Sequence, residues 1–397
     1  MPDNITILFL LKRVDCNDGV SSYCETLLTG LKANGDRVVI VSGPVTSSEK
    51  TQRRRQALES AALEWIILDH FRPNRPSGKT VKIILDTIRK YSVDVMSPQG
   101  LSLLPLSFMA SKLSGKPVIM NYHPSIHGSD TAGMAKRKSF KERTFYRITA
   151  TLFTPWKFIA LSKDIIRFFR EDCWISPHRI EYIVAGIDSD RYRPPSVVER
   201  KAARDLFQLS DTTLVCVLTG RLDLNKGHDL VIEAVRQLRV SDPELEIVCL
   251  FPGTGSYAAT VEAHAKKDAA DTASFRFLGF VDDDTLLKVY WASDIALLPS
   301  RLEGFGLAIA EGMACGAVPI RTPSGGSEDQ IIDGETGFLV PFDDAKALAA
   351  RIHDLADKDR RQRMRGTAIA HAQNHFGRQT MIAKTSALYH LAKSAAH

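Results

Sequence analysis

The sequence predicts an α/β protein built from two doubly wound, Rossmann-like parallel-sheet domains that face a central cleft. Short apolar stretches of strand length alternate with helical stretches along the chain, which is typical of a parallel sheet covered by helices on both faces. The alternation restarts after the pair Pro194-Pro195, and 397 residues suffice for two domains of ordinary size. Ligands of such sheets bind beyond the carboxyl ends of the strands, so a site is expected there.

Each expected element is a run whose apolar spacing and flanking turn residues fit one class of secondary structure. The strands of the first half are expected at Thr6–Leu11, Arg37–Ser42, Trp65–Leu68, Val93–Met96, Pro117–Tyr122, Phe158–Leu161 and Ile180–Val184. Those of the second half are expected at Thr213–Thr219, Glu246–Phe251, Phe275–Leu278, Ile295–Leu298, Val318–Arg321 and Phe338–Val340. Helices between them include Val20–Ala33, Leu101–Leu113, His228–Arg239 and Asp284–Trp291. The expected domains are residues 1–195 and 196–375, followed by a C-terminal helix over 376–397 that crosses back to the first domain.

Composition indicates a soluble cytoplasmic protein. The chain is 44% hydrophobic and 25% charged, and no apolar run approaches the roughly 18 residues of a membrane-spanning helix. The N-terminal apolar run is followed by Lys12-Arg13, whereas a secretory signal has its basic residues first. Six cysteines are scattered without a CxxC pair, which favours reduced thiols over a disulfide framework or a zinc site.

The positive charge is concentrated in the first half. Residues 1–200 carry 30 Lys and Arg against 20 Asp and Glu, a net +10, and the remainder carries 22 against 26, a net −4. Such an excess favours an anionic partner such as a membrane face, a phosphorylated lipid or an acidic glycan, with a solvated surface as the alternative. Nucleic acid is not expected, because the basic residues do not interleave with aromatic residues as in a binding module.

The segment Ser300–Gly316 is the strongest candidate for a ligand site. Gly304 and Gly306 let a ligand approach bare backbone, and the following apolar residues predict a short buried helix closed by Gly316. The free N–H groups at the start of that helix favour an oxygen-rich or anionic ligand. Glu303 lies in the loop and Glu311 is expected about two turns into the helix, so the two carboxylates would hold different hydroxyl groups of one ligand. An acidic loop beside a helix with one buried glutamate is the alternative.

Other polar and glycine residues also follow predicted strands. Gly19 opens a helix after the first strand, and His123 and His127 follow the strand at Pro117–Tyr122. Arg221 and Lys226 lie in the turn after the first strand of the second domain, where a guanidinium and an ammonium group are suited to neutralise a diphosphate. Gly253 forms a further tight turn, at the end of the strand Glu246–Phe251.

Taken together, these segments resemble the retaining GT-B glycosyltransferases of family 4 (GT4), the glycosyl transferases of group 1. The resemblance covers almost the whole chain and is sharpest in three spaced motifs: Gly220-Arg221 to Lys226-Gly227, Glu303 to Glu311 with seven residues between them, and Gly325-Gly326 to Val340. It implies that the first domain binds the acceptor and the second the nucleotide-sugar donor. One departure is Asp18-Gly19, where the family often has two glycines.

The resemblance also implies a role for each matching residue. Arg221, Lys226 and the Gly19 N–H would bind the diphosphate; Glu303 and the N–H groups of Phe305, Gly306 and Leu307 would bind the donor sugar. Glu311 would bind the ribose, Gly253 and Val281 would lie against the base, and His123 would contact the donor sugar, with Glu303 and His123 as the catalytic residues.

The implied reaction moves a hexose-type sugar from a nucleoside diphosphate, UDP-sugar first and GDP-mannose next, to a hydroxyl of a glycan, lipid-linked or small-molecule acceptor in surface glycoconjugate synthesis. Neither a metal nor another cofactor is expected, because cationic side chains and helix N–H groups would stabilise the leaving group. A same-face substitution, in which the departing phosphate takes the acceptor proton, is the hypothesis for the chemistry. The alternatives are a sugar-nucleotide epimerase, a pyridoxal-phosphate-dependent phosphorylase and a non-catalytic glycan-binding or assembly subunit.

A basic and aromatic stretch of the first domain is a candidate contact with the inner face of an anionic membrane. Its residues are Lys136, Arg137, Lys138, Lys141, Arg143, Phe145, Tyr146, Arg147, Leu152, Phe153 and Trp156. A basic surface helix with one side in the core is the alternative.

Overall fold

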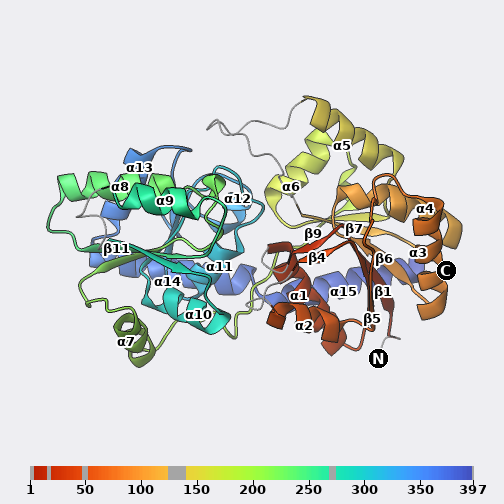
Figure 1. The fold of residues 1–397 in the computed structure, drawn as a ribbon, viewed down its shortest axis with the longest axis horizontal. Helices are drawn as coiled ribbons and strands as arrows, with labels where there is room; N and C mark the ends of the chain where they lie inside the picture. The colour runs from red at the N-terminus through yellow and green to blue at the C-terminus, as the bar shows by residue number, and fades with distance from the viewer. Residues whose placement is uncertain (1–3, 16–18, 47–51, 124–139, 268–273, 396–397) are drawn as a thin grey trace. The chain divides into compact units, whose positions relative to one another are not determined.

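The computed structural model describes residues 4–15, 19–46, 52–123, 140–267 and 274–395, which form two compact units (Figure 1). Unit 1 holds the described residues within 1–125, 136–186 and 378–397, and unit 2 those within 187–377. Each unit is a parallel sheet with helices packed on it, as the sequence predicts.

The sheet of unit 1 is built on the buried strand β1. Its main part has the order β5-β3-β1-β6, and parallel bridges from Met96 to Val118 and from Gln99 to Asn121 continue it into β7-β8-β9. The strands are β1 (Thr6–Leu11), β3 (Arg37–Ser42), β5 (Glu64–Ile67), β6 (Val95–Pro98), β7 (Ile119–Tyr122), β8 (Lys157–Ala160) and β9 (Ile180–Tyr182), with the short pair β2 (Val14–Asp15) and β4 (Val45–Thr46). The helices are α1 (Gly19–Ala33), α2 (Gln52–Ala61), α3 (Gly78–Tyr91), α4 (Leu104–Ser114), α5 (Phe140–Leu152), α6 (Lys163–Arg167) and α15 (Arg378–Ala395).

The sheet of unit 2 has the order β12-β11-β10-β13-β14-β15. The strands are β10 (Leu214–Val217), β11 (Ile247–Pro252), β12 (Phe275–Gly279), β13 (Ile295–Leu298), β14 (Val318–Arg321) and β15 (Phe338–Leu339). The helices are α7 (Val197–Leu206), α8 (His228–Ser241), α9 (Ala258–Ala265), α10 (Asp283–Ala292), α11 (Leu307–Ala314), α12 (Ser327–Gln330), α13 (Ala345–Asp354) and α14 (Lys358–His375). The strand order reverses between β10 and β13, and in such sheets ligands bind beyond the carboxyl ends of the strands at that point.

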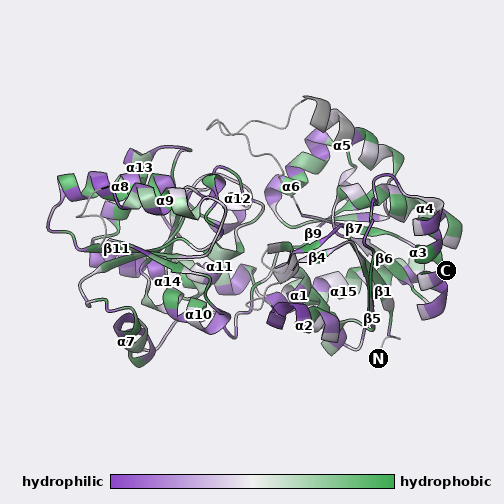
Figure 2. Cartoon of the chain, in the orientation of Figure 1, coloured by the Kyte–Doolittle hydropathy of each residue, from purple (hydrophilic) through white to green (hydrophobic). Residues whose placement is uncertain are grey.

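The strands at the centre of each sheet are apolar on both faces. All six residues of β1 and all four of β13 are buried, because helices cover both sides of the sheet. The strand ribbons are therefore mainly hydrophobic in colour, whereas helices such as α2 and α7 have polar outer sides (Figure 2). In β13 and β1 the structure confirms the predicted strand ends without a shift.

The C-terminal helix α15 belongs to unit 1. The Tyr389 hydroxyl lies 2.8 Å from Ser97 Oγ at the end of β6, and Ser386 Oγ donates to the buried Asp36 carboxylate at 2.9 Å. The Gly186 N–H contacts the sulfur of Met381, so the chain segment before unit 2 and the helix after it meet within unit 1.

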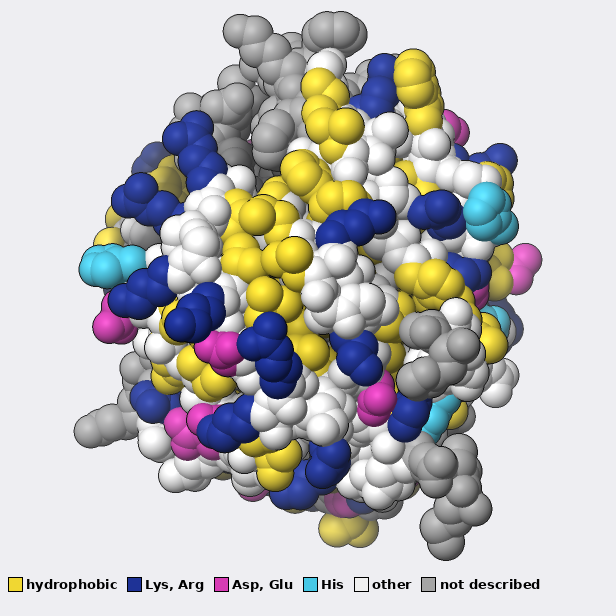
Figure 3. Space-filling model, turned by 90° about the vertical axis from the view of Figure 1, so that its right-hand side faces the viewer, with side chains coloured by type: hydrophobic (Ala, Val, Ile, Leu, Met, Phe, Trp, Pro, Cys, Tyr) yellow, Lys and Arg dark blue, Asp and Glu magenta, His cyan; other side chains and the backbone are white. Residues whose placement is uncertain are grey.

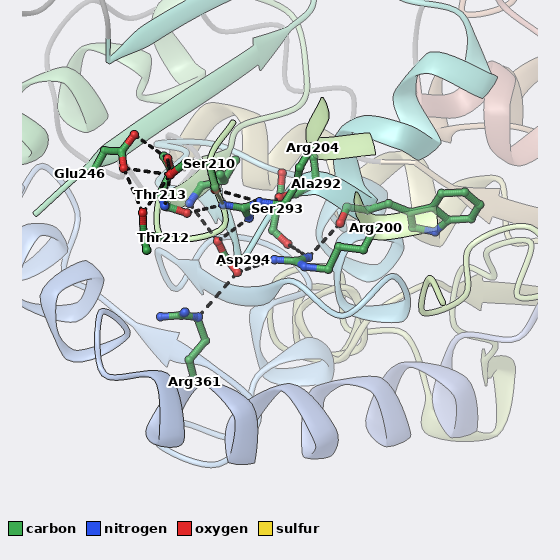
Figure 4. Close-up of polar contacts among 12 residues, drawn as sticks. Arg200, Arg204, Ser210, Thr212, Thr213, Glu246, Ala292, Ser293, Asp294 and Arg361 are labelled. Atoms are coloured by element: carbon green, nitrogen blue, oxygen red, sulfur yellow. Dashed lines mark hydrogen bonds and ion pairs between the residues drawn. The ribbon is translucent and has the colours of Figure 1, made fainter. Parts of the chain in front are cut away.

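In unit 2, Asp294 at the start of β13 anchors three helical arginines (Figure 4). Arg200 and Arg204 of α7 and Arg361 of α14 all reach its carboxylate, and the Val215 N–H of β10 donates to it at 3.0 Å. Arg204 is 3% exposed and also donates to the carbonyls of residues 210, 213 and 292. Because each buried charge has hydrogen-bonding partners, the network ties α7 and α14 to the sheet at a tolerable desolvation cost.

His228 at the start of α8 is a buried histidine. It is 1% exposed, its ring meets Phe251 edge to face at 5.2 Å, and neither ring nitrogen hydrogen-bonds to another described residue. Burial, and to a lesser degree the charge of Lys226, lower the pKa of His228 to about 4. An unfolded histidine with a pKa of about 6.5 takes up its proton first, so folding stability is lost as pH falls from about 6.5 towards 4.

We therefore expect His228→Leu to flatten the pH dependence of stability. The wild type should lose about 2 kcal/mol of unfolding free energy through this one histidine between pH 7 and pH 5. Urea unfolding at both pH values measures the difference, and His353→Gln, which changes a half-exposed side chain, is the control. Equal slopes for wild type and His228→Leu would contradict the assignment.

Candidate functional site

The candidate site of unit 2 is formed by the turns that follow β10, β11, β13 and β14. Glycines let these turns pack backbone against backbone. A Cβ atom on Gly253 would lie 1.8 Å from the Gly220 carbonyl oxygen, and one on Gly227 would lie 2.4 Å from the Pro299 carbonyl oxygen. These three glycines also have positive φ angles, which other residues rarely adopt. The structure thus places the predicted turn residue Gly253 directly against the Gly220–Gly227 turn.

Lys226 and Glu303 form an ion pair at the centre of this site. The Lys226 Nζ lies 2.6 Å from Glu303 Oε2, and the side chains are 21% and 14% exposed. Burial alone would raise the pKa of Glu303, but the charge and hydrogen bond of Lys226, with a further contribution from Arg321, lower it below the ordinary value. The carboxylate is therefore ionised at neutral pH and accepts hydrogen bonds, one of them from the Gly304 N–H at 3.1 Å.

Arg221 lies in the same turn but is mostly exposed. Its guanidinium pairs with Asp223 at 2.9 Å, and its side chain is 61% exposed. An exposed ion pair of this kind contributes little stability. The structure thus leaves Lys226 as the partly buried cation of the turn and Arg221 as its exposed one.

The Phe305–Leu307 segment leads into α11. Gly306 caps the helix with φ of 82° and has no side chain with which to cap the first N–H groups. The sequence places Glu311 about two turns into the helix, but this is wrong: the helix begins at Leu307, so Glu311 lies one turn in. Its carboxylate accepts a hydrogen bond from the Tyr290 hydroxyl at 2.9 Å.

The residues expected near the base lie at the ends of β11 and β12. The Gly253 N–H donates to the Gly279 carbonyl at 2.7 Å, which holds the two strand ends together. Val281 is the second residue after Gly279 and directly precedes Asp282, which caps α10 by accepting from the Thr285 N–H.

Two expected site residues belong to unit 1. Gly19 is the first residue of α1, and a Cβ atom there would meet no atom of the described residues within 4 Å. His123 is 9% exposed and packs edge to face on Tyr23 with 4.7 Å between ring centroids. Burial lowers the pKa of His123 to about 4, so its ring is neutral at pH 7.

A buried polar network holds the His123 ring. Gln99 uses its amide nitrogen on the carbonyl and hydroxyl oxygens of Ser97, so its oxygen faces His123 Nε2 at 2.9 Å. His123 therefore carries its proton on Nε2, and Nδ1 is an acceptor. Ser97 also bonds Tyr389 of α15, which extends the network to the C-terminal helix.

Four residues that shape these sites are not among those expected from the sequence: Gln99, Tyr290, Arg321 and Gln330. Arg321 carries one usable signal, because it is a long polar side chain at the carboxyl end of an otherwise apolar strand, and Gln99 directly follows the last residue of β6. Tyr290 and Gln330 lie on helices and carry no such signal.

Some expected features lie outside the described residues. These are His127, Asp18, Lys136, Arg137 and Lys138, together with the side chains of Lys141, Arg143, Phe145 and Tyr146. Within the described part of the chain, no group of three His, Cys, Asp or Glu side chains is placed to hold a metal ion. None of the described helices is long and apolar enough to cross a membrane.

Solved structures with similar folds cover nearly the whole chain. A glycosyltransferase from Rickettsia africae superposes with a TM-score of 0.78 at 20% identity, over 98% of this chain and 99% of that one. HepE of Anabaena, in complex with UDP and glucose, has a TM-score of 0.78 at 18% identity, over 97% and 99% of the two chains. At this level of identity the likeness concerns the fold.

Curated relatives match by sequence. A D-inositol 3-phosphate glycosyltransferase of Streptomyces scabiei is 32% identical over 235 residues, 57% of this chain and 51% of that protein. The chain thus spans about half the length of several curated relatives it matches. A GDP-mannose-dependent monoacylated α-(1-6)-phosphatidylinositol monomannoside mannosyltransferase of Corynebacterium glutamicum is 28% identical over 91% of this chain and 92% of its own.

Two family descriptions match consecutive parts of the chain. Residues 17–191 match Glycosyltransferase Family 4, and residues 199–371 match Glycosyl transferases group 1. Together they include every expected site residue and all strands of the two units except β1 and β2, which precede residue 17. The chain belongs to the family 4 glycosyltransferases of the GT-B fold.

Proposed function

We propose that the protein transfers a hexose-type sugar from a nucleoside diphosphate donor to a hydroxyl group of a glycan, lipid-linked or small-molecule acceptor, with retention of configuration. The observation that carries the proposal is the Lys226–Glu303 pair at the strand-order reversal of unit 2. It offers a cation for a diphosphate and a carboxylate for sugar hydroxyls within one site. UDP-sugar is the first candidate donor, supported by UDP in the HepE complex, and GDP-mannose is the second, supported by the name of the Corynebacterium relative.

In this proposal one set of residues binds the diphosphate of the donor and another set binds the hydroxyl groups of its sugar. Lys226, Arg221 and the Gly19 N–H bind the diphosphate, and Glu303 with the N–H groups of residues 305–307 binds the sugar. Glu311 accepts from the ribose, and Gly253 and Val281 lie against the base. The chemistry needs no further cofactor in this scheme, because the cationic groups neutralise the leaving diphosphate.

The reaction breaks the bond between the anomeric carbon and the diphosphate oxygen. The acceptor oxygen forms its bond to the same face of that carbon, and the acceptor proton passes to the departing phosphate oxygen. His123 contacts the reacting sugar as a neutral ring, which is consistent with its low pKa of about 4. Hydrogen-bond donors that are held in place near a developing charge account for a large part of enzymatic rate enhancement.

The first test is a donor panel that follows release of UDP, GDP or ADP. We expect the wild type to use one donor, and Glu303→Gln and Lys226→Met to lower kcat by roughly 10² to 10³-fold, since each removes a charged group from the donor site. Lys201→Met, which removes an exposed lysine paired with Asp205, is the matched control and should keep full activity. If the wild type neither turns over nor binds any of these nucleotides, the proposal is wrong and a glycan-binding role is favoured.

The second test concerns the role of His123. Gln99→Glu places a carboxylate on His123 Nε2 and should raise the pKa of the ring by about 1 to 2 units. Because a raised pKa means a protonated ring below the new value, the acid limb of the kcat profile should move to higher pH. Gln99→Met removes the bond without adding charge, so it should lower kcat and leave that limb in place. An unmoved limb in Gln99→Glu would contradict a role for the neutral ring.

We also propose that unit 1 rests on the inner, anionic face of a membrane through α4 and α5, where the acceptor or its product is lipid-linked. Each helix exposes an apolar pair four residues apart: Met109 and Leu113 at 40% and 66%, and Ile148 and Leu152 at 51% and 61%. The helices meet through the rings of residues 108 and 153 at 5.5 Å.

The surface around these pairs is cationic. On this side of unit 1, apolar side chains gather at the centre, Lys and Arg surround them, and Asp and Glu are sparse (Figure 3). Lys112 of α4 is exposed beside the apolar pair, and Lys79 and Lys82 are exposed on the neighbouring α3. Apolar side chains within a cationic rim suit an anionic lipid surface.

Flotation with vesicles tests this surface. We expect binding to phosphatidylglycerol-containing vesicles but not to pure phosphatidylcholine, and loss of binding in the double variant Leu113→Ser, Leu152→Ser. The control Val197→Ser, Val198→Ser removes two apolar side chains that are 87% and 78% exposed in unit 2 and should leave binding unchanged. Equal flotation of both double variants would contradict the surface.

A further inference from the structure

Arg321 is a fully buried arginine at the end of β14. Its side chain is 0% exposed. It is the one charged residue of a strand whose other residues are apolar, and the strand lies inside the sheet. Burying a guanidinium group is costly unless its N–H groups are hydrogen-bonded. The environment of Arg321 must therefore be built to receive it.

The partners of Arg321 come from two loops of the candidate site. Nη1 donates to the Phe305 carbonyl at 3.1 Å, in the loop that carries Glu303. Nη2 donates to the carbonyls of Ser324 and Gly325 at 3.2 and 2.7 Å and to Ser324 Oγ at 3.1 Å, in the loop after β14. One planar cation thus holds the two loops together.

Gln330 of α12 completes this arrangement. It is 0% exposed, its side-chain oxygen accepts from Arg321 Nη1, and its amide nitrogen donates to the carbonyls of Phe305 and Gly306 at 3.0 and 3.1 Å. The Phe305 carbonyl therefore receives two hydrogen bonds from the core side. We call Arg321 and Gln330 the loop pair.

The loop pair determines which way the backbone N–H groups point. In a planar trans peptide the N–H is directed opposite to the carbonyl of the preceding residue. Because the Phe305 and Gly306 carbonyls face Gln330 in the core, the N–H groups of Gly306 and Leu307 face away from it. These are two of the three N–H groups expected to bind the donor sugar.

The two loops pack closely against each other. A Cβ atom on Gly325 would lie 2.4 Å from the Glu303 carbonyl oxygen, and one on Gly326 would lie 2.5 Å from that of Phe305. The loops are thus in direct backbone contact, and the loop pair holds their backbones in place from the buried side. The positive charge of Arg321 also acts favourably on the Glu303 carboxylate.

We propose that Arg321 and Gln330 are positioning residues that set the sugar-binding loop, so that they control the affinity for the sugar part of a nucleotide sugar and not for its diphosphate. The inference rests on the proposed function. Lys226 and Arg221, which would bind the diphosphate, lie in a different turn, after β10, where Lys226 pairs with Glu303 and Arg221 with Asp223. A purely structural arginine would change both affinities together.

The test compares two ligands that differ by the sugar. Isothermal titration gives the Kd of UDP-glucose and of UDP, or of GDP-mannose and GDP if the donor panel selects guanine. In Arg321→Lys and Gln330→Met we expect the nucleotide sugar to bind about 10-fold more weakly, because each variant loses one or two hydrogen bonds that hold the loop. The Kd of the nucleoside diphosphate should be almost unchanged. Nucleotide-sugar KM should rise more than kcat falls.

Arg204→Lys is the matched control. Arg204 is another buried arginine of unit 2 that donates to backbone carbonyls, but it lies on α7 in the Asp294 network. We expect the variant Arg204→Lys to have a lower melting temperature than the wild type and an unchanged ratio of the two Kd values. An unchanged ratio in both Arg321→Lys and Gln330→Met would overturn the inference, whereas a wild type that binds no nucleotide sugar would overturn the proposed function itself.

Discussion

The ion pair between Lys226 and Glu303 is the interaction on which the candidate site depends. It joins the turn after β10 to the turn after β13, the two strands at which the sheet order of unit 2 reverses. Both charges are largely removed from water, so loss of one partner would leave the other unpaired at a high desolvation cost. The same pair keeps the carboxylate ionised and brings a cation and a hydrogen-bond acceptor into one place, which is the combination a nucleotide sugar requires.

At three places in the structure, buried polar side chains are stabilised by hydrogen bonds to the backbone or to one another. The loop pair, the Asp294 network and the group around Ser97, Gln99 and His123 each consist of long side chains that donate to backbone carbonyls or to one another. Such networks are stable when every member is bonded and costly when one is not. Two of the three lie beyond the carboxyl ends of strands, where they can orient groups that meet a ligand.

The family and the geometry of the site support each other. Membership of family 4 rests on two matches that together run from residue 17 to residue 371, and the fold rests on solved structures that cover nearly the whole chain. Donor, acceptor and membrane contact are proposals, each supported by particular residues. The proposed donor site rests mainly on residues of unit 2, and the proposed membrane surface on the exposed apolar residues of α4 and α5 in unit 1.

The sequence by itself determined the strands and the positions of the motifs. Continuous apolar runs such as Thr6–Leu11 can only be satisfied inside a covered sheet, and glycine-bearing turns follow them at fixed places. Only the tertiary structure decided that Lys226 pairs with Glu303, 77 residues away, that Arg321 is buried with Gln330, and that Gln99 sets the tautomer of His123. The physical reason is that hydrophobic periodicity is local, whereas a hydrogen-bond partner is selected by which strand ends the sheet order brings side by side.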